Sequence, residues 1–296
     1  MRANVTMDKR TKPEMATDGG RPEGSDTAAR VERTLVLRGD IAVIEVLAQG
    51  PTSGPQVVLL PSLGRGAEDF EPIAAALAAA GLRVLRPQPR GIGHSHGCTY
   101  EDLEDCAEDI AAVIEADGGG PAFLAGHAFG NRVSRLLATD RPDLVTAVSL
   151  IAANVGHAPS PPQVRAAIRN SANPELPREE RLEALRFAFF APGNNPEAWL
   201  DGWYPHVLAH QRMAGDRTSR QRDYAGGGKP ILYLQPSHDP LAHVEDAEIF
   251  RRDNGDRVKV VIVPNASHAA IAEQPDFIAR ELIAYAAQLW PASKIG

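Results

Sequence analysis

The sequence has few cysteines and no excess of positive charge, and these two features exclude several classes of protein. Neither Cys98 nor Cys106 stands in a CxxC or Cys/His pattern, so neither a disulfide framework nor a zinc site is indicated. We expect both to be reduced thiols in a cytoplasmic protein. The formal net charge of -7 argues against nucleic acid or an anionic membrane as a partner, because both attract clustered Lys and Arg. The expected partner is a small molecule, and the oligomeric state stays open.

The N-terminal segment lacks the long apolar run that a secretory signal or a membrane span requires. Residues 1–30 are instead charged and rich in Pro, Gly and Thr. Such a composition buries too little apolar surface to offset the entropy lost when the chain is ordered. We therefore predict a disordered tail over residues 1–30.

Beyond the tail, predicted strands alternate with predicted helices. Segments 31–37 and 41–47 flank a Gly-containing turn and predict an antiparallel hairpin. The later strands are continuous apolar runs, as expected where both faces of a sheet are covered. This alternation predicts βαβ units and a mostly parallel, doubly wound sheet of the α/β class. The expected buried strands are 56–60, 82–87, 121–126, 145–153, 229–236 and 257–264, and the expected helices include 68–81, 101–118 and 275–290.

The alternation stops between residues 154 and 228. This stretch shows helical patterns at 177–191 and 197–214 but no segment that predicts a strand. Because the strand pattern resumes at residue 229, we predict an inserted helical lid over 154–228 rather than a separate domain. The α/β core then comprises residues 31–153 and 229–296.

One turn of this core has the composition of a catalytic turn. The stretch Gly126–Gly130 reads GHAFG, follows an apolar strand and opens a helix. Small residues at both ends suit a tight turn whose central residue is strained and exposes its side chain above the sheet. Here the sequence resembles the α/β-hydrolase superfamily, whose elbow reads G-x-S-x-G. Ala128 stands at the position of the nucleophilic serine. The resemblance covers roughly residues 34–289 and implies an α/β-hydrolase fold.

The resemblance also implies an acid and a histidine. It places the triad acid at Asp239, in PSHDPLAHVEDA after the penultimate strand, and the histidine at His268, in PNASHAAIAEQPDF after the last strand. The order elbow, acid, histidine along the chain is the order of the family. We therefore expect Asp239 and His268 to face each other beside Ala128.

Two backbone N–H groups that bind an oxyanion are implied as well, and we assign them to Leu63 and Phe129. Leu63 lies in the loop LLPSLGRGAEDF, where relatives usually have His-Gly and this sequence has Pro61 and Ser62. Backbone donors do not depend on side-chain identity, so the resemblance still implies an oxyanion hole formed by these two N–H groups.

Several neighbouring residues have two interpretations. Arg65, beside the oxyanion loop, either clamps a substrate carboxylate or is a solvated loop residue. His127 is expected to pack under a neighbouring loop rather than to replace the nucleophile. The aromatic residues of the insertion either line an apolar substrate pocket or pack the lid, and Trp199 and Trp203 are the candidates for substrate binding. The full aromatic set is Phe187, Phe189, Phe190, Trp199, Trp203 and Tyr204.

A metal site is not predicted. His94, His96 and Cys98 alternate in RGIGHSHGC, but no carboxylate accompanies them. The resemblance explains this loop as the Arg-Gly-x-Gly-x-Ser segment of the family, Arg90 to Ser95. We predict neither a metal nor a cofactor.

Different classes of function remain open. An enzyme of this fold without the serine can use His268, oriented by Asp239, as a general base. It would act on a water that attacks an ester-like or lactone-like carbonyl, or on a substrate proton in lyase or isomerase chemistry. The alternatives are a non-catalytic ligand-binding or regulatory protein that keeps the pocket, and a serine hydrolase in which Ala128 is an engineered replacement. Of these we predict the enzyme, and hydrolysis as its reaction.

Overall fold

A mixed, mostly parallel sheet forms the centre of the computed structural model, which describes residues 30–155 and 161–291. The strand order is β1-β2-β4-β3-β6-β7-β8-β9, and the short β5 pairs with β2. All strands from β3 onward on this path pair in parallel, whereas β2 is antiparallel to both β1 and β4. The strands are β1 (Glu32–Arg38), β2 (Ala42–Gln49), β3 (Gln56–Leu60), β4 (Arg83–Pro87), β5 (His96–Gly97), β6 (Ala122–His127), β7 (Val145–Ile151), β8 (Ile231–Pro236) and β9 (Val258–Val263). The predicted hairpin and parallel sheet are confirmed.

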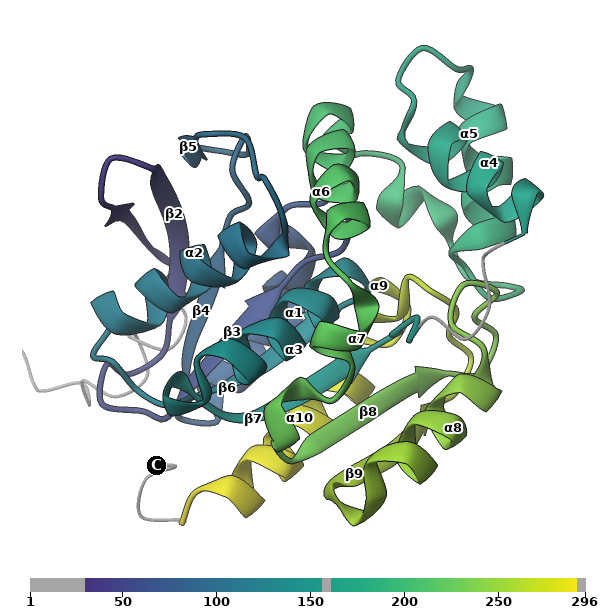
Figure 1. The fold of residues 1–296 in the computed structure, drawn as a ribbon. Helices are drawn as coiled ribbons and strands as arrows, with labels where there is room; N and C mark the ends of the chain where they lie inside the picture. The colour runs from purple at the N-terminus through teal and green to yellow at the C-terminus, as the bar shows by residue number, and fades with distance from the viewer. Residues whose placement is uncertain (1–29, 156–160, 292–296) are drawn as a thin grey trace, which may run out of the picture.

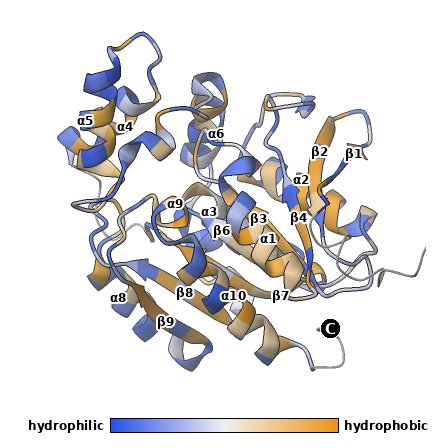
Figure 2. Ribbon diagram, turned by 180° about the vertical axis from the view of Figure 1, so that it is seen from behind, coloured by the Kyte–Doolittle hydropathy of each residue, from blue (hydrophilic) through white to orange (hydrophobic). Residues whose placement is uncertain are grey.

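Helices cover both faces of the sheet (Figure 1). One apolar core lies under α1 (Glu71–Ala79) and α10 (Pro275–Leu289). The second lies under α2 (Leu103–Ala116), α3 (Phe129–Asp140) and α8 (Val244–Asn254). Figure 2 shows α1 and α10 from behind, with the apolar strands between the two layers. The continuous apolar runs of β3 and β6 are buried along their whole length because they face both cores.

The region between β7 and β8 is helical in the part of it that the structure describes. Its elements are α4 (Pro162–Ala172), α5 (Arg178–Ala188), η3 (Pro196–Trp199), α6 (Pro205–Arg217), α7 (Arg220–Tyr224) and η4 (Gly226–Gly228). We call this region the insertion. In Figure 1 its helices α4, α5 and α6 stand above the carboxyl ends of the strands. Whether the insertion acts as a lid stays a prediction, and the tail predicted for 1–30 lies outside the described residues except for Arg30.

One predicted helical segment of the insertion is interrupted in the structure. The pattern at 197–214 predicts helical structure, and the structure divides this segment into η3 and α6 with an interruption between them. Gly202 has a positive φ of 80°, which a helix does not contain, and Pro205 has no N–H to donate and begins α6. Local backbone chemistry therefore overrides the helical spacing.

Shorter helices complete the connections of the core. They are η1 (Ala67–Phe70), η2 (Pro142–Leu144), η5 (Gly255–Arg257) and α9 (Ala270–Glu273). Within the described residues, no helix has both the length and the apolar content that a bilayer crossing needs.

Candidate active site

The turn between β6 and α3 has the strained backbone that its sequence predicts. Ala128 has φ 47° and ψ -105°, a conformation that residues with a Cβ rarely adopt. The flanking glycines are needed for space. A Cβ on Gly126 would lie 2.4 Å from the backbone of Gly130 and Asn131, and a Cβ on Gly130 would lie 2.4 Å from the carbonyl oxygen of Leu60. The turn thus keeps the shape of an elbow with a methyl group at its tip.

The expected oxyanion donors flank this tip. Phe129 is the first residue of α3, so its N–H has no partner inside the helix and lies at the positive end of the helix dipole. The Leu63 N–H has no hydrogen-bond acceptor among the described residues. Gln211 of α6 accepts a hydrogen bond of 2.8 Å from the N–H of the next residue, Gly64. This bond ties the loop of Leu63 to the insertion.

Asp239 and His268 face each other as a hydrogen-bonded pair. The Nδ1 atom of His268 lies 2.8 Å from Oδ2 of Asp239, and both residues are buried. The other oxygen of Asp239 accepts hydrogen bonds of 2.8 and 3.0 Å from the N–H groups of Leu241 and Ala242. An ionised Asp239 can only accept, so it holds the proton of His268 on Nδ1 and leaves Nε2 as the basic nitrogen.

Glu273, which sequence reasoning did not single out, holds the histidine loop in place. Its half-buried carboxylate accepts hydrogen bonds from the N–H of Ser267, the N–H of Ala191 and the side-chain amide of Asn194. Burial raises the pKa of Glu273. The acidic residue shortly after His268 was the only signal of this role, because its partners Ala191 and Asn194 come from the insertion.

His127 lies beneath the site rather than in it, as its prediction states. Its Nε2 donates a 2.7 Å hydrogen bond to the carbonyl oxygen of His268, and its ring packs edge-on against Trp199. Its other nitrogen, Nδ1, is buried without a partner among the described residues. Burial first, and the nearby His268 second, lower the pKa of His127 to about 3. Neutral His127 therefore supports the loop of His268 through this hydrogen bond.

A cavity of about 540 Å³ brings the elbow, the histidine and the insertion together. Its volume lies within the range of small-molecule sites. Ala128, His268, Leu63 and Phe129 line its floor, next to Ser62. The walls come mainly from the insertion and include Phe189, Trp203, Ile168, Gln211, Arg165, Arg212, Asp216 and Arg220. The site thus faces a space that the core and the insertion line together.

Arg65 has a different role from either of its two interpretations. It is 2% exposed, and its guanidinium forms a two-pronged pair with Asp69, with both distances 2.7 Å. It also donates to the carbonyl of Asp201 and lies over the rings of Trp199 and Trp203. Arg65 does not line the cavity. The expectation that it clamps a substrate carboxylate is wrong, because Asp69 already occupies its fork; Arg65 fastens the insertion to the core.

The aromatic residues of the insertion divide between packing and lining. Trp199 is 1% exposed and does not line the cavity, so its expected contact with substrate is wrong; it packs on His127 and Phe189. Phe189 and Trp203 do line the cavity. Phe187 is exposed.

The histidines near residue 95 do not converge on a metal site. His94 lies 3.3 Å from Glu45, and Nδ1 of His96 lies 2.8 Å from the carbonyl oxygen of His94. Arg90 of the same loop pairs with buried Asp109 and donates to the carbonyl of Cys98. Among residues 30–155 and 161–291, no group of three or more His, Cys, Asp or Glu side chains is arranged to hold a metal ion.

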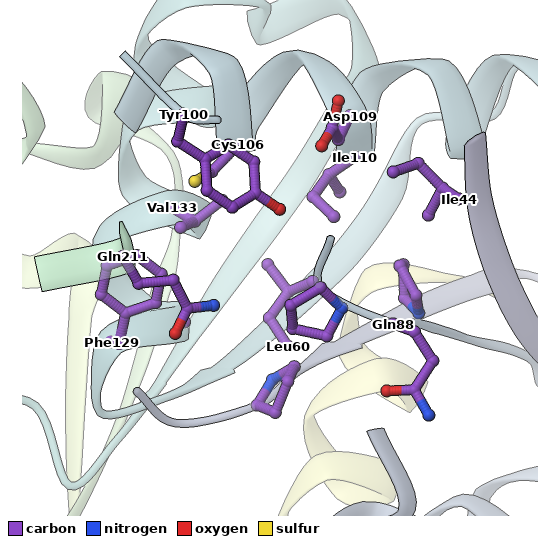
Figure 3. A pocket seen from close by; sticks show the side chains of 14 residues that line it. Ile44, Leu60, Gln88, Tyr100, Cys106, Asp109, Ile110, Phe129, Val133 and Gln211 are labelled. Carbon is purple, nitrogen blue, oxygen red and sulfur yellow. The ribbon is translucent and has the colours of Figure 1, made fainter. Parts of the chain in front are cut away.

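Figure 3 shows a second pocket beside the elbow, lined largely by apolar side chains such as Leu60 and Val133. It shares Phe129 and Gln211 with the main cavity, but its volume is only about 40 Å³. A water needs at least about 10–15 Å³ by this kind of measure, so the pocket has room for a few waters and not for a substrate.

The family of the chain follows from its match to known sequences. Residues 57–281 match the profile of the alpha/beta hydrolase family, and this match extends over most of the chain. The chain therefore belongs to the α/β hydrolase family.

Individual relatives match shorter stretches. The chain is 34% identical over 104 residues to the putative carbamate hydrolase RutD of Variovorax paradoxus, which covers 34% of this chain and 39% of that protein. It is 31% identical over 120 residues to epoxide hydrolase B of Mycobacterium tuberculosis, which covers 39% of this chain and 33% of that protein. The chain thus spans only about a third to two fifths of the length of these curated relatives.

Solved structures resemble the whole fold. A putative lipase from Acinetobacter baumannii superposes with a TM-score of 0.73 at 16% identity, covering 93% of this chain and 99% of that one. An esterase from Thermogutta terrifontis superposes with a TM-score of 0.70 at 20% identity, covering 87% and 99%. At these identities the likeness shows the fold alone.

Proposed function

We propose that this protein hydrolyses a small ester-like or lactone-like carbonyl compound without a serine nucleophile. The observation that carries the proposal is the 2.8 Å pair of His268 and Asp239 beside a cavity that Ala128 also lines. The hydrolases among its relatives support the reaction class. The elbow supports the absence of an acyl-enzyme, because Ala128 has no atom that can attack.

In this reaction a water molecule takes the place of the serine. Nε2 of His268 accepts a proton from the water while its oxygen attacks the carbonyl carbon. The negative charge moves to the carbonyl oxygen, which accepts hydrogen bonds from the N–H groups of Leu63 and Phe129. When the intermediate collapses, the alkoxide leaves and takes the proton from Nε2, so that an acid and an alcohol are released. The space next to the methyl group of Ala128 holds the water.

The general base and the oxyanion donors are expected to accelerate the reaction by comparable factors. A positioned general base accelerates such a reaction on the order of 10²–10⁴-fold. Each oxyanion donor contributes roughly 10²–10³-fold. Their combination supports a slow hydrolase even though the nucleophile is missing.

The first experiment measures hydrolysis of activated esters and lactones by the native protein and by His268→Ala. We expect the variant to lose on the order of 10²–10⁴-fold in kcat/KM. Equal rates in the two proteins would overturn the proposal. Binding of substrates without turnover, unchanged in His268→Ala, would favour the non-catalytic alternative.

The second experiment tests whether the rest of the machinery is correctly arranged. Ala128→Ser is expected to raise hydrolysis of 4-nitrophenyl acetate by about 10²-fold or more, and to be labelled covalently by a fluorophosphonate, seen as a mass increase. The double variant Ala128→Ser/His268→Ala is expected to lose both properties. An Ala128→Ser protein that is neither faster nor labelled would contradict the assigned base or oxyanion hole.

A further inference from the structure

The wall of the cavity that faces the site carries a concentration of positive charge. Four arginines line it, and Asp216 is its one carboxylate among the described residues. This is unexpected in a chain whose formal net charge is -7. The arginines come from separate elements, one from α3 and three from the insertion, and they are Arg132, Arg165, Arg212 and Arg220.

Arg132 is occupied by the protein itself. Its Nε lies 2.7 Å from Oδ2 of buried Asp223, and its other nitrogens donate to the carbonyls of Gly215 and Thr218. Its charge is therefore shared with Asp223, which also lies 3.4 Å from Arg135. Arg132 contributes structure to this wall and little free binding capacity.

Arg212 is different, because its guanidinium makes no hydrogen bond or ion pair with any described residue. Its Nε is also shielded from solvent. A buried donor without an acceptor costs about 1–3 kcal/mol, and more when the group is charged, so such groups normally have a partner. Its two terminal nitrogens also lack a partner among the described residues but are not shielded in this way, and because Arg212 lines the cavity, these nitrogens can bind a ligand there.

The neighbours of Arg212 leave it facing inward. Gln211, Arg212, Gly215 and Asp216 all line the cavity, at spacings that form one side of α6. On α4, Arg165 and Ile168 line it three residues apart. Figure 1 shows α4 and α6 as separate helices over the carboxyl ends of the strands. The positive wall and the floor with His268 therefore belong to one space.

Arg220 is another of the cations that line this wall. Desolvation first, and then the charge of nearby Arg132, lower the pKa of Arg220. The carboxylates of Asp223 and Asp216 act on Arg220 in the opposite direction and raise its pKa. The one hydrogen bond that Arg220 donates to a described residue is long, at 3.4 Å, and goes to the carbonyl of Asn154.

We propose that the substrate carries an anionic group, a carboxylate or a phosphate, which Arg212 binds with the support of Arg165 and Arg220 while the reacting carbonyl lies beside His268 and Ala128. This inference rests on the proposed function and names its substrate class. Arginine suits the role because its planar fork donates two parallel hydrogen bonds to either kind of anion. The positive wall also attracts anions into the cavity, and this attraction weakens as salt is added.

Equilibrium binding tests the anion site without reference to turnover. Glutarate, inorganic phosphate and neutral glutaramide are titrated into the native protein and followed by calorimetry, and the first two distinguish a carboxylate site from a phosphate site. We expect at least one anion to bind and glutaramide not to bind. Arg212→Met, which keeps the bulk of the side chain, is expected to weaken anion binding about 10-fold or more, and Arg212→Lys less than Arg212→Met.

The matched control is Arg217→Met. Arg217 lies on the same helix, is exposed and does not line the cavity. It is expected to bind the anions like the native protein. Equal weakening in both variants would show a general effect of charge on α6 and would overturn the site.

A kinetic comparison then connects the site to the reaction. The ratio of kcat/KM for mono-4-nitrophenyl glutarate to that for neutral 4-nitrophenyl butyrate is expected to exceed 1, and to fall about 10-fold in Arg212→Met. Absence of anion binding together with His268-dependent hydrolysis of the neutral ester would overturn this inference and leave the proposed function standing. Anion binding that Arg212→Met weakens, with no His268-dependent turnover, would support the anion site and overturn the proposed function.

Discussion

The candidate site has two parts, the elbow and the Asp239–His268 pair, and different interactions determine their geometry. The backbone determines the elbow: the strained φ of Ala128 and the close approach of Gly130 to Leu60 set its shape, and the methyl group of Ala128 has no reactive atom. The pair Asp239 and His268 is a matter of side chains, joined by one 2.8 Å hydrogen bond. The comparison teaches that the shape of this elbow does not depend on a serine, whereas the orientation of the base depends on the carboxylate of Asp239.

The largest effect is expected from a variant that disrupts the hydrogen bond between Asp239 and His268. In Asp239→Asn the remaining oxygen still accepts from Leu241 and Ala242, but an NH₂ group then faces Nδ1 of His268. Nδ1 must become an acceptor, so the proton moves to Nε2 and the base is lost. We expect kcat/KM for ester hydrolysis to fall about 10²–10⁴-fold, or roughly 3–5 kcal/mol, by steady-state kinetics. A loss below 3-fold, matching that of exposed Asp256→Asn, would contradict the assigned role.

The next effect breaks the backbone half. The Cβ of Gly130→Ala would lie 2.4 Å from the carbonyl oxygen of Leu60, and backbone atoms in a core strand cannot give way cheaply. We expect a loss of about 3 kcal/mol in the free energy of unfolding, measured by urea denaturation. Gly215→Ala is the control, because the nearest atom there is a guanidinium nitrogen at 3.2 Å. Similar midpoints for the two variants would show that the elbow tolerates a side chain at its second glycine.

A third effect tests the buried His127, which supports the loop of His268, through the pH dependence of stability. Folded His127 takes up a proton only near pH 3, whereas the unfolded residue does so near pH 6.5. Between these values the unfolded state binds more protons, so His127 makes the protein less stable as the pH falls through this window. Removing the titration with His127→Gln is expected to flatten the slope of unfolding free energy against pH by up to about 1.4 kcal/mol per unit.

Denaturant titrations at several pH values between 4.5 and 7.5 measure this slope for the native protein, for His127→Gln and for exposed His210→Gln. The last variant is expected to run parallel to the native protein. A His127→Gln curve that also runs parallel to it would mean that the pKa of His127 is the same in the folded and the unfolded state.

The smallest effect sharpens the view that the elbow is strained. Glycine adopts φ 47° and ψ -105° more readily than alanine, so Ala128→Gly is expected to stabilise the protein by about 1 kcal/mol despite the greater freedom of its unfolded chain. Ala138→Gly, within the regular part of α3, is expected to destabilise it by about 1 kcal/mol or more. Thermal unfolding of both variants measures the contrast, and a loss of stability in Ala128→Gly would mean that the turn is relaxed.

The sequence by itself determined the alternation of strands and helices, the hairpin at the start of the sheet and the family of the chain. These follow from local patterns: continuous apolar runs in β3 and β6, and a short glycine spacing at the elbow. Gly202 and Pro205 also indicate the break between η3 and α6, but the helical spacing of the residues around them favours helix across it.

Apart from the pair of Asp239 and His268, which the family resemblance indicated, only the tertiary structure decided which polar residues meet. Arg65 and Asp69 are close in sequence, yet the partners that bury Arg65, the rings of Trp199 and Trp203 and the carbonyl of Asp201, come from far along the chain. Glu273 and Arg212 gained their roles in the same way, one through long-range hydrogen bonds and one through the lack of a partner. The physical reason is that periodicity reports burial of a local face, whereas a charged group's role depends on which distant donors and acceptors folding brings within hydrogen-bond reach.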